Sequence, residues 1–161
     1  MHKLPLFLTL FFVAQACAAG ECMVLPKVAE NFVKTFNAKV RGAEDCSARQ
    51  VVRGDVDADG IEDLVVAFTI EGACGNDKSS AAGTCGNHDE TYLKIFPGRT
   101  AKEIPVLQIA SRGARQIVGL RLANGKILAD TLNFGRDDPA CCPSIKGNAR
   151  FTLGTKGIMA D

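Results

Sequence analysis

Residues 51–70 of the chain read VVRGDVDADGIEDLVVAFTI. An acidic turn that contains Gly60 separates two valines from residues 64–70, a run that is apolar almost throughout. A short continuous apolar run is typical of a β-strand that is covered on both faces. The stretch therefore predicts a buried strand that follows a tight acidic turn.

Strand-like segments continue along the rest of the chain. Asn124-Gly125 is the strongest hairpin signal, because both turn positions require a positive φ angle. Pro97-Gly98 ends another strand-like segment. Together with residues 64–70, the expected strands are residues 92–96, 104–110, 117–122, 126–134 and 150–153. They predict an antiparallel meander of about six strands.

One helix is expected before the first strand. Its apolar residues recur three and four positions apart, as on one face of an α-helix. Pro26 suits the first helical turn, and residues 37–42 form the exit. The face consists of Leu25, Val28, Ala29, Phe32, Val33 and Phe36. The predicted fold class is therefore α+β, with the N-terminal helix packed on the meander, or on a small sandwich if the sheet folds over.

Residues 1–19 have the features of an export signal. Lys3 precedes an apolar run at residues 4–14, and Ala16-Cys17-Ala18 is a small-x-small cleavage site. A membrane-spanning helix needs about 20 apolar residues, so we expect no transmembrane segment in the mature chain. The expected organisation is a signal peptide at residues 1–19 and a single secreted α+β domain at residues 20–161, in the periplasm or outside the cell.

Cys17 leaves an alternative open at this cleavage site. Removal of residues 1–19 discards Cys17 and leaves an even number of cysteines, which favours a cut after it. Residues 13–17, VAQAC, resemble a bacterial lipobox, and a cut before Cys17 would leave it as a lipid anchor.

The composition argues against several classes of function. The chain has 19 Lys and Arg against 18 Asp and Glu, a net charge of +1, so nothing favours binding to nucleic acid. His88 is the only histidine outside the leader, and no nucleophile elbow, P-loop or H-E-x-x-H motif occurs. We therefore expect no catalytic role.

The acidic turn has the pattern of a calcium loop. Asp55, Asp57 and Asp59 alternate, Gly60 permits a sharp bend, and Asp63 follows. Calcium takes six to eight oxygen ligands, and alternating carboxylates on a curled loop can point inward together. The backbone carbonyl of Ile61 can complete the shell. The candidate ligands of a structural Ca²⁺ are Asp55, Asp57, Asp59, Ile61 and Asp63.

The same loop resembles those of a known family. It is not an EF-hand, because Val66 stands where that loop needs a bidentate glutamate. Residues 54–66 instead resemble the D-x-D-x-D-G-x-x-D-L calcium loops of FG-GAP and VCBS repeats. The resemblance implies that the ligand roles fall on the same four aspartates and the Ile61 carbonyl. It does not extend to the propeller fold of that family, which needs several repeats.

Six cysteines remain after the leader and predict disulfide bonds in an oxidising compartment. One pair flanks the helix and one lies in the loop at residues 72–89. The adjacent pair could form a strained vicinal bridge, or each could join a different partner, which is easier geometrically. A zinc site that uses the loop pair and His88 is a less favoured alternative. The pairs in that order are Cys22 and Cys46, Cys74 and Cys85, and Cys141 and Cys142.

The last pair lies in a segment that resembles other exported proteins. Residues 137–144 read DDPACCPS, similar to the D-P-x-C-C-P-S segment of small exported bacterial proteins such as the LppP/LprE type of lipoprotein. The resemblance implies export and a disulfide-bonded domain.

These features predict a small exported calcium-binding domain that recognises an unknown protein or surface ligand. A periplasmic or lipid-anchored inhibitor or immunity-type protein is one alternative. An enzyme of unknown class is the other, and it would require a cleft with convergent polar groups.

Overall fold

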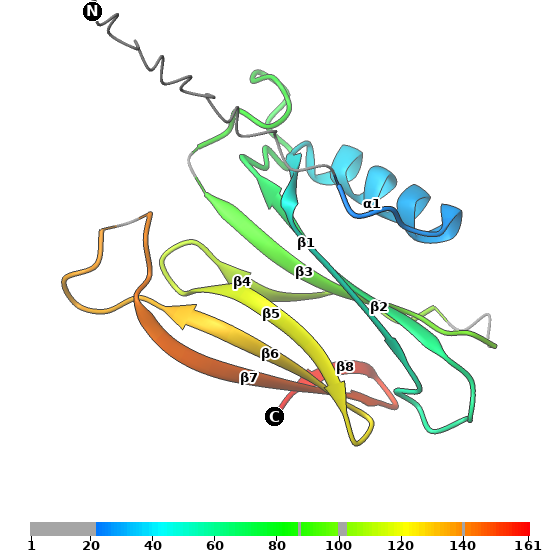
Figure 1. The fold of residues 1–161 in the computed structure, drawn as a ribbon. Helices are drawn as coiled ribbons and strands as arrows, with labels where there is room; N and C mark the ends of the chain where they lie inside the picture. Colours follow the sequence, from blue (N-terminus) through cyan, green and yellow to red (C-terminus); the bar gives the residue numbers. More distant parts are fainter. Residues whose placement is uncertain (1–21, 87, 100–102, 140) are drawn as a thin grey trace, which may run out of the picture.

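The computed structural model describes residues 22–86, 88–99, 103–139 and 141–161, which contain one helix and one antiparallel sheet (Figure 1). The sheet order is β1 to β8 without a crossover, so each strand pairs with its neighbour in the chain. The elements are α1 (Lys27–Val40), β1 (Ala43–Gly54), β2 (Asp63–Glu71), β3 (Asp89–Phe96), β4 (Leu107–Ser111), β5 (Arg115–Ala123), β6 (Lys126–Asn133), β7 (Ile145–Gly154) and β8 (Gly157–Ala160). The expectation of an α+β fold with an antiparallel meander is confirmed.

The expected number of about six strands is wrong, because the sheet has eight. The first half of β1 reads AEDCSAR and has no apolar alternation, and its register to β2 shifts between Asp45 and Gln50. β8 has only four residues and pairs with β7 alone. Both strands owe their conformation to a neighbouring strand, so local patterning does not reveal them.

β2 is covered on both faces, as its apolar run predicts. Val65 and Ala67 point into a core shared with β3 to β8, whereas Val66 and Phe68 point toward α1. All four residues are completely buried. Because side chains alternate along a strand, the odd-numbered residues Val65 and Ala67 enter one core, and the even-numbered residues Val66 and Phe68 enter the other.

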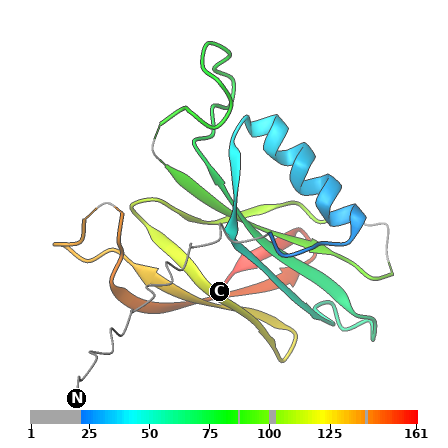
Figure 2. The same ribbon diagram turned by 45° about the horizontal axis from the view of Figure 1, so that its top comes forward.

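The meander folds over on itself, so its two halves form a sandwich around the first of these cores (Figures 1 and 2). β1 comes close to β5 at the fold. There the Gln50 side-chain amide donates a hydrogen bond to the Ile117 carbonyl, at 3.2 Å. The molecule thus has three layers: the helix, the strands β1 to β3, and the strands of the second half.

α1 lies across the outer face of β2 and β3 (Figure 2). Ala29 and Val33 are buried against that face, and Phe32 packs edge-on against Phe68 and Phe96. Val28 was expected on the buried face but is 64% exposed. The helix covers one half of the sheet only and is short of the length and hydropathy that a membrane-spanning helix would need.

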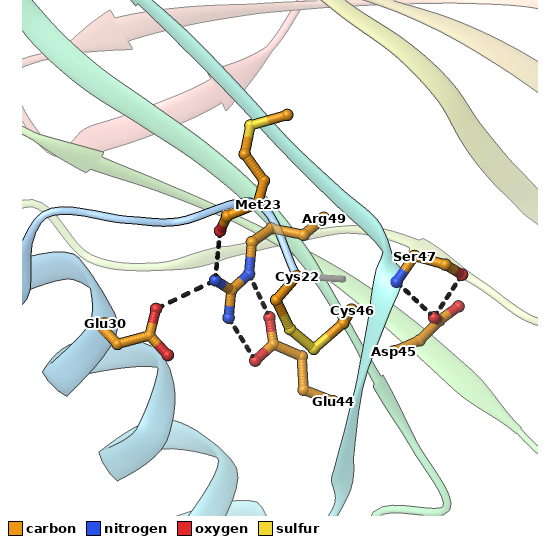
Figure 3. A network of polar contacts seen from close by, with 8 residues as sticks. All are labelled: Cys22, Met23, Glu30, Glu44, Asp45, Cys46, Ser47 and Arg49. Atoms are coloured by element: carbon orange, nitrogen blue, oxygen red, sulfur yellow. Dashed lines mark hydrogen bonds and ion pairs between the residues drawn. A yellow bond between two sulfur atoms is a disulfide. The ribbon is translucent and has the colours of Figure 1, made fainter. Parts of the chain in front are cut away.

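A buried guanidinium joins the start of the described chain to β1 and α1 (Figure 3). The Arg49 side chain is 1% exposed and donates two hydrogen bonds of 2.8 Å to the Glu44 carboxylate. It also donates to Glu30 on α1 and to the carbonyl of Met23. The Glu44 carboxylate is the main cause that raises the pKa of Arg49, so the guanidinium stays charged.

The six cysteines form three disulfides: Cys22–Cys46, Cys74–Cys85 and Cys141–Cys142. The first lies beside Arg49 and joins the segment before α1 to β1 (Figure 3). The second closes the loop after β2. The third pairs adjacent residues, whereas the sequence favoured separate partners for each of them. The expected signal peptide at residues 1–19 and the alternative anchor at Cys17 lie outside the described residues.

Replacement of Arg49 by alanine should destabilise the fold by about 3 kcal/mol, because it leaves the Glu44 carboxylate, whose side chain is 13% exposed, without its cation. Urea denaturation measures this loss. Arg53→Ala is the matched control, since its ion pair with Glu62 is at least half exposed on both sides and should contribute less than about 1 kcal/mol. Equal losses in the two variants would contradict the structural role of Arg49.

Replacement of Cys141 by serine should create one new free thiol, on Cys142 alone. Thiol alkylation of the denatured, non-reduced protein followed by peptide mass spectrometry locates it. A new thiol on any of the other four cysteines would contradict the vicinal pairing.

Candidate metal centre

The acidic loop connects β1 to β2 and is closed by the pairing of Gly54 with Asp63. Two of its residues have left-handed backbone conformations, Ala58 at φ 62° and Gly60 at φ 82°. Gly60 adopts this conformation without a steric penalty, whereas Ala58 does so at a cost of about 1 kcal/mol. The loop is therefore curled tightly enough for its side chains to turn back toward its own backbone.

The exposed carboxylates accept hydrogen bonds from N–H groups of the loop. Asp55 accepts from the backbone of Asp59 at 3.2 Å and of Gly60 at 2.9 Å. Asp57 also accepts from Asp59, at 3.1 Å. Asp59 accepts from Ile61 at 2.8 Å. These bonds shape the loop and orient Asp55 and Asp57 toward its interior.

Asp63 is the buried member of the group, with 1% of its surface exposed. Its Oδ2 accepts a hydrogen bond of 2.9 Å from the Val56 N–H at the start of the loop. Its Oδ1 accepts one of 3.0 Å from the Gly98 N–H, after β3. One carboxylate thus joins the loop to a second segment that is distant in the sequence.

Gly98 is a part of this arrangement that the sequence did not reveal. A Cβ atom at this position would lie 2.3 Å from the Glu62 carbonyl oxygen, so only glycine brings its N–H to Asp63 without a shift of the loop. In the sequence Pro97-Gly98 indicates only the end of a strand. The contact with Asp63 follows from the pairing of β2 with β3, which places Leu64 opposite Phe96.

The structure brings together three of the predicted ligands. One carboxylate oxygen each of Asp55, Asp57 and Asp63 lie within 4.8 Å of one another. Calcium binds oxygen at about 2.3–2.6 Å, so oxygens on opposite sides of one ion are separated by about this distance. Asp59 is not in this group, because its carboxylate turns to the N–H of Ile61.

The cluster carries a concentrated negative charge. Partial desolvation raises the pKa of Asp57, and the charges of Asp63, Asp59 and Asp55 raise it further, against a lowering effect of the Asp59 N–H. Arg53 is the nearest cation along β1, and its ion pair is with Glu62 rather than with a member of the cluster. The peptide N–H groups of the loop therefore offset part of the charge of these carboxylates.

The groups of potential metal ligands that contain cysteine offer no thiolate, because their cysteines form disulfides. Cys74 and Cys85 form a disulfide, so they cannot supply thiolates to a zinc site with His88. A second group of potential ligands, Cys22, Glu44 and Cys46, has its sulfurs in a disulfide and its carboxylate bonded to Arg49.

Comparisons with protein-family models, with curated protein sequences and with solved structures found no match for this chain.

Replacement of Asp63 by asparagine should destabilise the protein by about 1 kcal/mol even in the presence of a chelator. A hydrogen bond to a charged acceptor contributes about 1.5–3 kcal/mol, whereas the repulsion relieved is about 1 kcal/mol for two charges 4 Å apart in water. The loss of the bond to Val56 or Gly98 therefore outweighs the gain. Urea denaturation in chelator checks the value.

Asp59→Asn is the control for that measurement. An asparagine can still accept the bond from the Ile61 N–H, and the site is exposed, so the change should stay within about 0.5 kcal/mol. If Asp63→Asn is no more destabilising than Asp59→Asn, the bridging role of Asp63 is wrong.

Proposed function

We propose that this chain is an exported, disulfide-bonded binding domain in which a structural Ca²⁺ is held by the β1–β2 loop. The observation that carries the proposal is the convergence of Asp55, Asp57 and Asp63, whose oxygens lie at the spacing of a cation shell and accept hydrogen bonds from backbone N–H groups. The domain acts by recognising a protein or a surface ligand and has no catalytic role.

The donor set favours calcium over other metals. All three side chains are carboxylates, which suit hard cations, whereas zinc prefers nitrogen and sulfur donors. The loop is open on the side of Asp55 and Asp57, which are exposed, so water can fill the remaining positions of a six- to eight-fold shell. Magnesium demands a stricter octahedron at about 2.0–2.1 Å. The resemblance to FG-GAP and VCBS loops points to calcium as well.

The ion would act as a staple of the hairpin. Asp63 is fixed by its bonds to Val56 and Gly98, so a cation on it would draw the two exposed aspartates toward the sheet. We assign the ligand roles to Asp55, Asp57 and Asp63, with the Ile61 carbonyl and water completing the shell. Asp59 shapes the loop through its bond to the Ile61 N–H and is not a ligand in this proposal.

Two features support export. The leader-like residues 1–19 end at a small-x-small site. Three disulfides in a chain of this length are typical of proteins of oxidising compartments. The periplasm or the extracellular space also supplies calcium at concentrations where a site with a Kd of about 10⁻⁴–10⁻³ M is filled.

Calcium should raise the melting temperature of the oxidised protein relative to the same protein in chelator. A ligand at one hundred times its Kd stabilises by about 2.7 kcal/mol, which corresponds to a shift of several degrees. Asp57→Asn should abolish most of this shift, because it removes one of the three charged ligands. Differential scanning calorimetry without reductant measures both.

Asp59→Asn tests whether the effect of Asp57→Asn comes from the loss of a ligand or only from the loss of a negative charge in the loop. It removes the same charge two residues away, and it should keep most of the calcium-dependent shift. A wild-type melting curve that is identical in calcium and in chelator would overturn the proposed site. Loss of the shift in both variants alike would overturn the distinction between Asp57 and Asp59.

A further inference from the structure

A groove runs between α1 and the segment that leads into β4, apart from every residue of the acidic loop. It encloses about 330 Å³. Phe32 and Phe36 of α1 form one apolar wall, and Val106 forms part of the other. All three side chains are only partly buried, so their apolar surface is accessible within the groove.

Lys94 lies at the base of this groove and is 5% exposed. It is an even-numbered residue of β3, between Tyr92 and Phe96, and the alternation of the strand therefore directs it to the aromatic side, under the helix. Its Nζ lies 4.7 Å from the centre of the Phe32 ring and 5.8 Å from that of Phe96. The strand register thus places a cation in the aromatic layer.

Within the described part of the chain, the ammonium of Lys94 donates a hydrogen bond to the carbonyl of Ile104, although an ammonium group has three donors. None of the ion pairs of the described residues includes Lys94. Burial lowers the pKa of Lys94, and the negative charge of Glu103 opposes this effect. A buried charge without a paired counterion is costly, and a carboxylate that enters the groove would supply that counterion.

The rest of the groove fits such a ligand. Lys39, exposed on α1, adds a second positive charge to the lining, and Glu103 is the one carboxylate among the described lining residues. Phe32 and Phe36 on one wall and Val106 on the other can cover a hydrocarbon body, as in ligand sites that are mostly apolar with a few convergent polar groups.

We infer that this groove binds a small amphipathic carboxylate, with its acyl body against Phe32 and Val106 and its carboxylate on the Lys94 ammonium. The chemical class is a short- or medium-chain acyl carboxylate. Lys94 selects for the negative head group, and the ring of Phe32 limits the width of the body. This inference shares no residue with the calcium proposal, so either can fail without the other.

Octanoate is the probe, with octylammonium and octanol as ligands of the same length and different charge. Isothermal titration of the oxidised full-length protein should show binding of octanoate and much weaker binding of the other two. Lys94→Met keeps the length of the side chain and removes its charge, so it should weaken octanoate binding roughly ten- to a hundredfold, since charge-assisted hydrogen bonds contribute about 1.5–3 kcal/mol.

Two exposed variants complete the test and do not depend on the folding of the Lys94 variant. Glu103→Gln removes the competing carboxylate and should tighten octanoate binding by roughly two- to fivefold, in the range of an exposed charge interaction. Lys34→Met removes a lysine of α1 that does not line the groove and should leave the affinity unchanged. The inference is overturned by an absence of octanoate binding at low-millimolar concentration, by equal binding of octylammonium, or by a Glu103→Gln variant whose affinity stays the same or falls.

Discussion

The buried carboxylate of Asp63 is the constraint on which the acidic loop depends. Because water does not reach it, its oxygens need N–H donors from the protein, and these come from Val56 and from Gly98. The first of these bonds curls the loop over the start of β2, and the second holds the turn after β3 against it. Asp55 and Asp57 lie beside Asp63, which concentrates negative charge at one end of the sheet.

The alternation of side chains along β2 and β3 decides which residues face the helix and which face the second half of the sheet. Odd-numbered residues of β2 and β3 fill the core between the two halves of the sheet, and even-numbered residues face the helix. Lys94 obeys this rule although its charge does not suit an aromatic layer. The contacts of the ammonium with the Ile104 carbonyl and the face of the Phe32 ring offset part of the cost of its burial.

Features encoded within a short stretch could be predicted from the sequence. The buried strand and the helix are examples, as is the Asn124-Gly125 hairpin, where both residues have positive φ. The grouping of Asp55, Asp57 and Asp63 also followed from spacing. The turning of Asp59 to Ile61 did not, because it depends on how the loop curls. Two features depend on contacts that only the folded chain supplies: the role of Gly98 and the short strand β8. The choice between a Cys141–Cys142 bridge and separate partners also depends on where the fold places the other cysteines.

The unbroken order of the sheet has a kinetic consequence. Every strand pairs with the one that follows it in the chain. Each pairing therefore requires closure of only the turn or loop that connects the two strands. Search through short loops is fast compared with search for distant partners. The approach of β1 to β5 is the exception, since it brings Gln50 to Ile117 across a large separation in the chain. Assembly of the hairpins can therefore precede closure of the sandwich, and that closure is the step where the topology should slow folding.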